Sequence, residues 1–230
     1  MKKIGLIGGL TWVSTLEYYR LLNELVNERK GDSEAAEIIL YSVNFGQIKK
    51  LTEAGDWNSI SAIICDAARA LEKAGADCLL LGANTMHKIA PEILASIKIP
   101  LIHIATITAH AIGRENMKKV ALLGTKYTMQ LDFYKNALAQ YGIETLIPAV
   151  SEIEVINKAI YTELGKNIFL PSTRQYFVSV IDDLARQGAQ GVILGCSEIP
   201  MLIKQSDSPI IVFDTTRLHA MAAVEFALGG

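Results

Sequence analysis

Short runs of aliphatic residues alternate along the chain with longer stretches in which apolar positions recur every three to four residues. The runs are continuous in apolar character, which is typical of strands in a parallel sheet that helices cover on both faces. We expect strands over residues 4–8, 38–43, 78–81, 101–104, 120–124, 145–147, 192–194 and 210–213. An amphipathic helix is predicted over residues 14–30, with Ser14 and Glu17 as a capping box at its start. The pattern indicates an α/β protein.

Three segments of the first half recur in the second half, in the same order and at a nearly constant offset. The matched pairs are residues 1–9 and 117–125, 75–85 and 188–198, and 99–104 and 208–213. This repetition predicts two pseudo-symmetric α/β domains, each around a mainly parallel four-stranded sheet, with a site in the cleft between them. We expect residues 1–104 with 209–230 to form the first domain and residues 105–208 the second.

The bulk composition narrows the class of protein. Half of the 230 residues are hydrophobic, a fifth are charged, and the net charge of −2 gives no support for a nucleic-acid partner. The chain contains no apolar stretch near the roughly 18 residues of a membrane span, and the apolar run after Met1 is too short for a signal peptide. Its three cysteines, an odd number at wide spacings, argue against a disulfide framework and favour the cytoplasm.

Two turns of one design follow buried strands: "LGANT" at residues 81–85 and "LGCSE" at 194–198. Ligands of parallel sheets bind at the carboxyl ends of the strands, so a pseudo-two-fold axis would place residues 83 and 196 on opposite sides of one cleft. Cys196 precedes a predicted helix, whose N–H groups and dipole are expected to lower the thiol pKa.

Polar residues of the same turns suit an amino-acid ligand. Asn84, Thr85 and Ser197 can hold a carboxylate together with backbone N–H groups, and Glu198 can orient an ammonium group. Lys166 is the basic residue that we nominate for a side-chain carboxylate, against the alternative of an exposed loop lysine.

Each of the other chemically interesting residues also has a packing interpretation. Cys65 and Cys78 are expected in the core, whereas the position of Cys196 after Leu-Gly, repeated in the sister turn, favours a functional role. His87 donates either to a ligand or to backbone, and Trp12 and Tyr18 either line a pocket or pack in the core.

The four histidines have no metal-ligand spacing with the cysteines, so we expect no metal. No phosphate-binding or dinucleotide-binding motif is present.

The segments "GGLTWVSTLEYYRLLN", "ANTMHKIA", "VALLGTKYTM" with "DFY", and "GVILGCSEIPMLI" together resemble the aspartate/glutamate racemase family, in its aspartate-racemase branch. The resemblance implies a homodimer that inverts the α-carbon of an amino acid without a cofactor. One cysteine removes the α-proton and a second returns a proton to the other face; residues 83 and 196 match these two positions. The residues that match the substrate pocket are Leu10, Thr52, Asn84, Thr85, Ser197 and Glu198.

Ala83 departs from the family pattern, because a methyl group neither takes nor gives a proton. Three explanations stay open: an engineered substitution, replacement of the first base by water or His87, or a one-thiol reaction like that of arylmalonate decarboxylase. The racemase motifs weigh against the last, and an amino-acid-binding protein without turnover is a further alternative. We expect a racemase of aspartate or glutamate, with Cys196 as its remaining acid/base residue.

Overall fold

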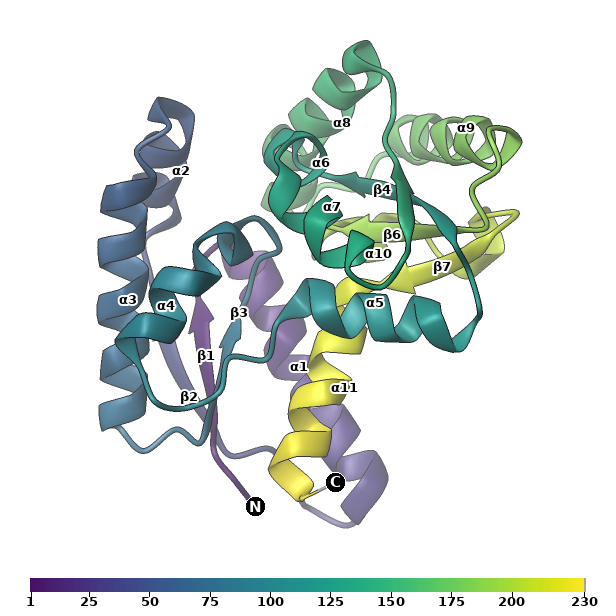
Figure 1. Ribbon diagram of the computed structural model, residues 1–230. Helices are drawn as coiled ribbons and strands as arrows, with labels where there is room; N and C mark the ends of the chain where they lie inside the picture. Colours follow the sequence, from purple (N-terminus) through teal and green to yellow (C-terminus); the bar gives the residue numbers. More distant parts are fainter. Residues whose placement is uncertain (230) are drawn as a thin grey trace. The chain divides into compact units, whose positions relative to one another are not determined.

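The chain folds into two α/β units, each built around a parallel sheet of its own (Figure 1). The computed structural model describes residues 1–229. Unit 1 comprises Met1–His103 and the segment from His219 onward, and unit 2 comprises Ile104–Leu218. The second crossing between units lies at Leu218 rather than at residue 208, because the last strand pairs within the sheet of unit 2.

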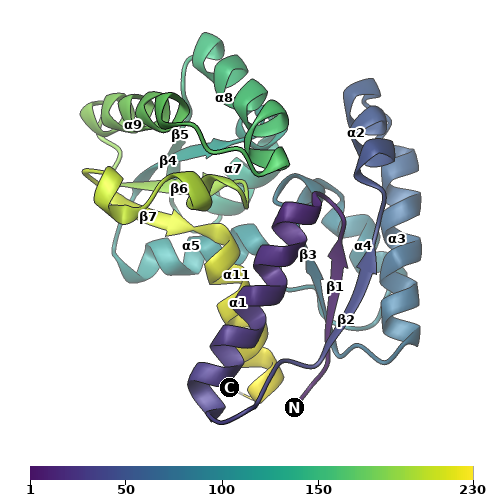
Figure 2. The ribbon, with the colours of Figure 1, turned by 180° about the vertical axis from the view of Figure 1, so that it is seen from behind.

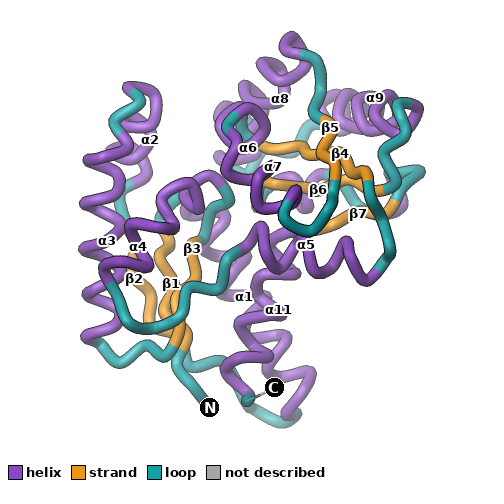
Figure 3. Tube along the Cα trace, viewed as in Figure 1, coloured by secondary structure: helices purple, strands orange, loops and turns teal. Residues whose placement is uncertain are grey.

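The sheet of unit 1 contains three parallel strands in the order β2-β1-β3 (Figure 3). These strands are β1 (Ile4–Gly8), β2 (Ile38–Ser42) and β3 (Cys78–Leu81). The helices of unit 1 are α1 (Trp12–Lys30), α2 (Phe45–Ala54), α3 (Trp57–Lys73), the 3₁₀ helix η1 (Thr85–Ile89), α4 (Ala90–Ser96) and most of α11 (Thr215–Leu228). The strand expected over residues 101–104 is reduced to one bridge, Leu79 to Leu101, because a helix begins at Ile104.

Successive residues of β1 point to opposite faces of this sheet, and each face has its own core. Ile4 and Leu6 pack under α1 and α11, which lie side by side (Figure 2). Ile7 packs on the other face, in the core that α3 shares with α2 and α4. The β-strands of unit 1 are therefore sandwiched between two helical layers, as their continuous apolar character predicts.

The sheet of unit 2 contains four parallel strands in the order β5-β4-β6-β7. They are β4 (Lys119–Gly124), β5 (Glu144–Leu146), β6 (Gly191–Gly195) and β7 (Ile211–Asp214). Helices α8 and α9 cover one face, and α5 and α7 the other (Figure 1). The helical elements are α5 (Ile104–Arg114), α6 (Lys126–Gln130), α7 (Asp132–Ala139), α8 (Val150–Thr162), η2 (Leu164–Lys166), α9 (Pro171–Arg186), α10 (Ile199–Leu202) and η3 (Gln205–Asp207).

The two sheets have the same strand order when the repeated segments are matched. β1 corresponds to β4, β2 to β5, β3 to β6, and the bridge at Leu101 to β7. The predicted α/β class with two related parallel sheets is confirmed, with three strands and a bridge, in place of four strands, in the first sheet. Among residues 1–229 we find no helix with the length and apolar character that a membrane crossing requires.

The start of α1 differs from the sequence prediction. Thr11 is the N-cap, and its side chain accepts a hydrogen bond from the Ser14 backbone N–H, so the helix begins two residues before Ser14. Ser14 is buried inside the first turn and donates its hydroxyl to another loop, which is why it does not cap the helix.

Candidate functional site

In unit 1, the carboxyl ends of β1 and β3 form two adjoining turns. The first turn needs glycine at Gly9, because φ is +72° there and a Cβ would lie 2.1 Å from the Val43 carbonyl oxygen. Ser14 joins the two turns by donating its hydroxyl to the Gly82 carbonyl at 2.7 Å. Leu10 is buried in the first turn, close in sequence to this link.

The second turn carries Ala83, Asn84 and Thr85. Asn84 and Thr85 are buried, and Ala83 is half-buried against the core of α3 and α4. The imidazole of His87 contacts the backbone of this turn, since its Nδ1 lies 3.1 Å from the Ala83 carbonyl oxygen. A carbonyl oxygen only accepts, so Nδ1 carries the proton and Nε2 carries the lone pair.

His87 belongs to a buried cluster with His103 and His219. Its ring centroid is 4.9 Å from that of His103 and 5.5 Å from that of His219. Burial, together with the two neighbouring histidines, lowers the pKa of His87 well below its usual range, so this imidazole is neutral. Its Nε2 is buried and has no hydrogen-bond partner among the described residues. Because Nδ1 is bonded to backbone and Nε2 is closed off, the structure favours the backbone-donor interpretation of His87 over the role of a replacement base.

Tyr18 completes this cluster. Its hydroxyl donates to His219 Nδ1 at 2.8 Å, and His219 Nε2 donates to the Ile102 carbonyl oxygen at 2.6 Å. Tyr18 is therefore a packing residue with a satisfied hydroxyl, whereas Trp12 is 58% exposed. Within residues 1–229, no three His, Cys, Asp or Glu side chains are arranged to hold a metal ion.

In unit 2, the turn after β6 gathers Cys196, Ser197 and Glu198 around one carboxylate oxygen. The Cys196 thiol donates to Glu198 Oε2 at 3.0 Å, and the Ser197 hydroxyl donates to the same oxygen at 2.9 Å. All three residues are buried, with 8% of Cys196 and 3% of Glu198 exposed. The sequence placed these residues in one turn, and the structure brings their side chains into contact.

The pKa of Cys196 moves in the direction opposite to our expectation. Burial raises the pKa of this thiol well above its usual range, and the charge and side-chain hydrogen bond of Glu198 raise it further. The Glu198 backbone N–H acts the other way, as predicted for a helix start, but it is outweighed. Because α10 has four residues, its dipole is small. The resting side chain is therefore a protonated thiol.

Several polar residues at the same edge of unit 2 were missed by the sequence reasoning. Thr125 and Thr128 are buried at the end of β4, with their hydroxyl oxygens 3.2 Å apart. Asp214 ends β7 and accepts from the Thr216 and Arg217 backbone N–H groups, and Thr215 donates its hydroxyl to the Leu194 carbonyl. Their common signal was available, since each follows or ends a predicted strand.

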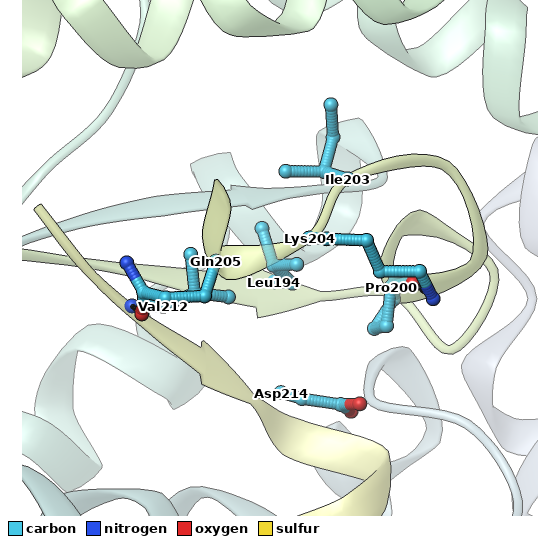
Figure 4. A pocket seen from close by; sticks show the side chains of 7 residues that line it. All are labelled: Leu194, Pro200, Ile203, Lys204, Gln205, Val212 and Asp214. Atoms are coloured by element: carbon cyan, nitrogen blue, oxygen red, sulfur yellow. Dashed lines mark hydrogen bonds between the residues drawn. The ribbon is translucent and has the colours of Figure 1, made fainter. Parts of the chain in front are cut away.

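A cavity of about 200 Å³ lies beside this edge (Figure 4). Its lining residues are Leu194, Pro200, Ile203, Lys204, Gln205, Val212 and Asp214, none of which is a predicted site residue. The polar groups of Gln205 bond to the backbone of Ile210 and Val212, and Lys204 Nζ donates to the Pro200 carbonyl oxygen. These side chains are therefore occupied in holding the loop after α10.

The remaining residues singled out in the sequence lie outside the two turns. Thr52 is buried on α2 and donates its hydroxyl to the Ile48 carbonyl of its own helix. Lys166 is exposed at the end of η2. Cys65 and Cys78 are in the two cores of unit 1, which confirms their packing role.

Comparison with known proteins covers nearly the whole chain. The model of the Asp/Glu/hydantoin racemase family matches residues 7–223. The chain is 26% identical to the broad specificity amino-acid racemase RacX of Bacillus subtilis over 169 residues, which are 74% of this chain and 73% of RacX.

Solved structures give a closer match. A candidate Asp/Glu racemase from Yersinia pestis is 43% identical with a TM-score of 0.91, and the match covers 99% of this chain and 100% of that one. An aspartate racemase homologue from Pyrococcus horikoshii OT3 is 36% identical with a TM-score of 0.86, over 99% of this chain and 100% of that one.

Proposed function

Because the chain belongs to the Asp/Glu/hydantoin racemase family, we propose that it inverts the α-carbon of aspartate or glutamate, without a cofactor, by taking and returning the α-proton. The relatives support an isomerase of the racemase type. The acidic substrate is the finer part of the proposal. It is supported by the relatives whose names specify Asp/Glu or aspartate, whereas RacX is described as broad in specificity.

The observation that carries the proposal is the buried thiol of Cys196 in contact with Glu198 at the carboxyl end of β6. A protonated thiol in this place is suited to give a proton to an α-carbanion. In the proposed reaction the S–H bond breaks, a C–H bond forms at the α-carbon, and a thiolate remains. In the reverse direction the thiolate takes the α-proton and becomes a thiol again.

Inversion also needs a proton-transferring group for the opposite face of the α-carbon. Ala83, at the position that matches this group, supplies none, so we propose that transfer on that face is slow and uses water. The residues that we propose to contact the substrate are Leu10, Thr52, Asn84, Thr85, Lys166, Ser197 and Glu198.

The test is incubation of the purified protein with each enantiomer of aspartate and of glutamate in D₂O. Loss of the α-proton is followed by NMR, and inversion is followed by chiral chromatography. We expect exchange from both enantiomers at unequal rates, with slow inversion. The Cys196→Ser variant should lose exchange at the thiol-facing side by about 10²-fold or more.

The controls separate chemistry from folding. The Cys65→Ser variant removes a thiol from the core of unit 1 and should leave the ratio of the two exchange rates unchanged. If Cys196→Ser folds normally and exchanges the α-proton at the wild-type rate, the proposed role of Cys196 is wrong. If no enantiomer exchanges at all, the proposed activity is wrong.

We also propose that the protein is a homodimer, as the resemblance implies, and that it is cytoplasmic, as the number and spacing of its cysteines favour. Light scattering after size-exclusion chromatography measures the mass. A mass of one chain at micromolar concentration would contradict the dimer.

A further inference from the structure

Glu198 is placed to control the protonation of Cys196. Its Oε2 accepts from the thiol at 3.0 Å and from the Ser197 hydroxyl at 2.9 Å. Only 3% of Glu198 is exposed, so solvent screens its interaction with the thiol weakly. In the part of the chain that the structure describes, Glu198 is the titratable group that acts on this thiol.

This arrangement makes a thiolate at Cys196 unfavourable in the resting protein. Losing the thiol proton would place a second negative charge about 3 Å from a buried carboxylate and would break the S–H···O bond. Two acidic groups in one buried site do not both ionise unless a cation compensates their negative charges. The carboxylate therefore stabilises the thiol and opposes the thiolate.

An α-amino acid brings its own cation. A substrate ammonium beside Glu198 compensates the carboxylate and removes the main charge that opposes ionisation of Cys196. An acid of the same shape without nitrogen brings only further negative charge. The Glu198 carboxylate thus allows Cys196 to ionise beside an acid that has an α-ammonium group and opposes its ionisation beside an acid that has none.

We propose that Glu198 makes ionisation of Cys196 conditional on a cationic amino group, so that the site acts on α-ammonium acids and leaves nitrogen-free acids of the same shape unreacted. This inference rests on the proposed racemase function, and it assigns Glu198 as the residue that determines specificity for the amino group. When the ammonium binds, the thiol proton is released to solvent and the thiolate is formed. The charge changes balance, because one proton leaves as one anion forms.

Proton release on binding tests this directly and needs no turnover. The probe is 2-methylaspartate, which has an ammonium group but no α-proton, and its partner is methylsuccinate, in which a hydrogen atom replaces the ammonium group. Calorimetric titration at neutral pH in two buffers of different ionisation enthalpy gives the number of protons released. We expect release with 2-methylaspartate and none with methylsuccinate. Release should disappear in Cys196→Ser.

The second measurement is the ultraviolet absorbance of the thiolate, taken as the difference between each protein and its Cys196→Ser counterpart. In Glu198→Gln, which keeps the shape and removes the charge, the thiolate fraction without ligand should rise by about tenfold or more at neutral pH. The matched control is Ser197→Ala, which removes the other donor to Oε2 and keeps the charge. In Ser197→Ala the thiolate fraction should decrease or rise by about twofold at most, far less than in Glu198→Gln.

Each result decides between the alternatives. Equal proton release with both probes, or a folded Glu198→Gln protein with an unchanged thiolate fraction, would overturn the inference. If Glu198→Gln fails to fold, the two probes on the wild-type protein still give the answer. Conditional ionisation without any α-proton exchange in D₂O would contradict the racemase proposal and leave the role of Glu198 intact, so the two failures are distinguishable.

Discussion

At residue 83 the side chain contributes little to the structure of its turn. The turn is held through backbone groups, with the Ser14 hydroxyl on the Gly82 carbonyl and His87 Nδ1 on the Ala83 carbonyl. Ala83 itself is half-buried and packs against the core of unit 1. A different side chain can therefore change the chemistry at this position while the turn keeps its shape.

Ala83→Thr should raise the slower of the two exchange rates, because it supplies a hydroxyl where the resemblance places an acid/base group. Gains from one such group are about 10²–10⁴-fold at most, and Ala83→Cys should give the larger gain because a thiol ionises more readily. The α-proton exchange of each enantiomer in D₂O measures this. Ala83→Val, which has the shape of threonine without the hydroxyl, is the control, and an equal gain in Ala83→Val would contradict the chemical explanation.

The histidine cluster predicts loss of stability in acid. Burial lowers the pKa of His219 to about 4, against about 6.5 in an unfolded chain. Between these values the unfolded chain binds more protons than the folded one. The contribution of His219 to the free energy of unfolding is therefore fully present above about pH 6.5 and is lost as the pH falls. Between about pH 7 and about pH 4.5, the free energy of unfolding of His219→Gln should therefore fall by about 2 kcal/mol less than that of the wild type.

Denaturant unfolding at a series of pH values measures this difference. The control is His110→Gln, at an exposed histidine in unit 2, which should keep the wild-type pH dependence. An unchanged slope of stability against pH in His219→Gln would show that another group causes the acid lability.

The candidate residues could be predicted better than their ionisation. Cys196, Ser197 and Glu198 follow an apolar run, which was enough to place them at a strand end. The raised pKa of Cys196 could not be predicted, because it depends on burial and on which Glu198 oxygen faces the thiol. The contact between His87 and His219 joins distant parts of the chain, and no local pattern signals it.

At the scale of elements, β4 and β6 approach closely at their carboxyl ends, just before the Cys196 turn. A Cβ on Gly124 would lie 2.9 Å from the Gly195 carbonyl oxygen, and a Cβ on Gly195 would lie 2.9 Å from the Leu123 carbonyl oxygen. The two glycines therefore allow the pairing that positions Cys196.

Gly124→Ala should destabilise the protein by about 1–3 kcal/mol, because the new methyl group meets backbone that cannot move without breaking the β4–β6 pairing. Gly113→Ala is the matched control. Gly113 is an exposed residue of α5 with nothing within 4 Å of its Cβ position, and alanine there should stabilise by up to about 1 kcal/mol. Thermal unfolding compares the two, and equal effects would contradict the argument from close approach.

Most elements could be predicted because continuous apolar runs match buried parallel strands. β1 and β3 have the predicted limits, Ile4–Gly8 and Cys78–Leu81. The prediction failed where tertiary contacts decide: Ser14 resembles an N-cap in sequence but bonds to Gly82, and the run at 101–104 turns into α5 after one bridge.

At the scale of the whole molecule, unit 1 is made from two distant pieces of chain. Ala220, Ala223, Val224 and Ala227 of α11 pack on Ile4 and other residues of one core, and the Lys2 backbone N–H donates to the Ala227 carbonyl at 2.9 Å. The internal repeat predicted two domains and a returning C-terminal segment. Its crossing point was misplaced because similarity between strands does not show which sheet each one joins.

A chain that ends at Leu218 should therefore lose one core of unit 1 and keep unit 2. Cys78 reports on this core, since it is fully buried and burial raises its pKa to about 12, with a smaller contribution from Asp77. In the shortened chain its labelling by a maleimide should be roughly a thousandfold faster at neutral pH. Cys196 in unit 2 is the internal control and should label at its full-length rate. If Cys78 stays protected, α11 is dispensable for this core.

The discontinuity of unit 1 also sets the order in which the protein can be completed during translation. All of unit 2 is synthesised before residues 219–229 are made. A nascent chain thus has the full sequence of unit 2 while the apolar face formed by Ile4, Leu6 and Leu80 still lacks its α11 cover. Until synthesis reaches the end of α11, that face is the part of the polypeptide on which chaperones and proteases can act.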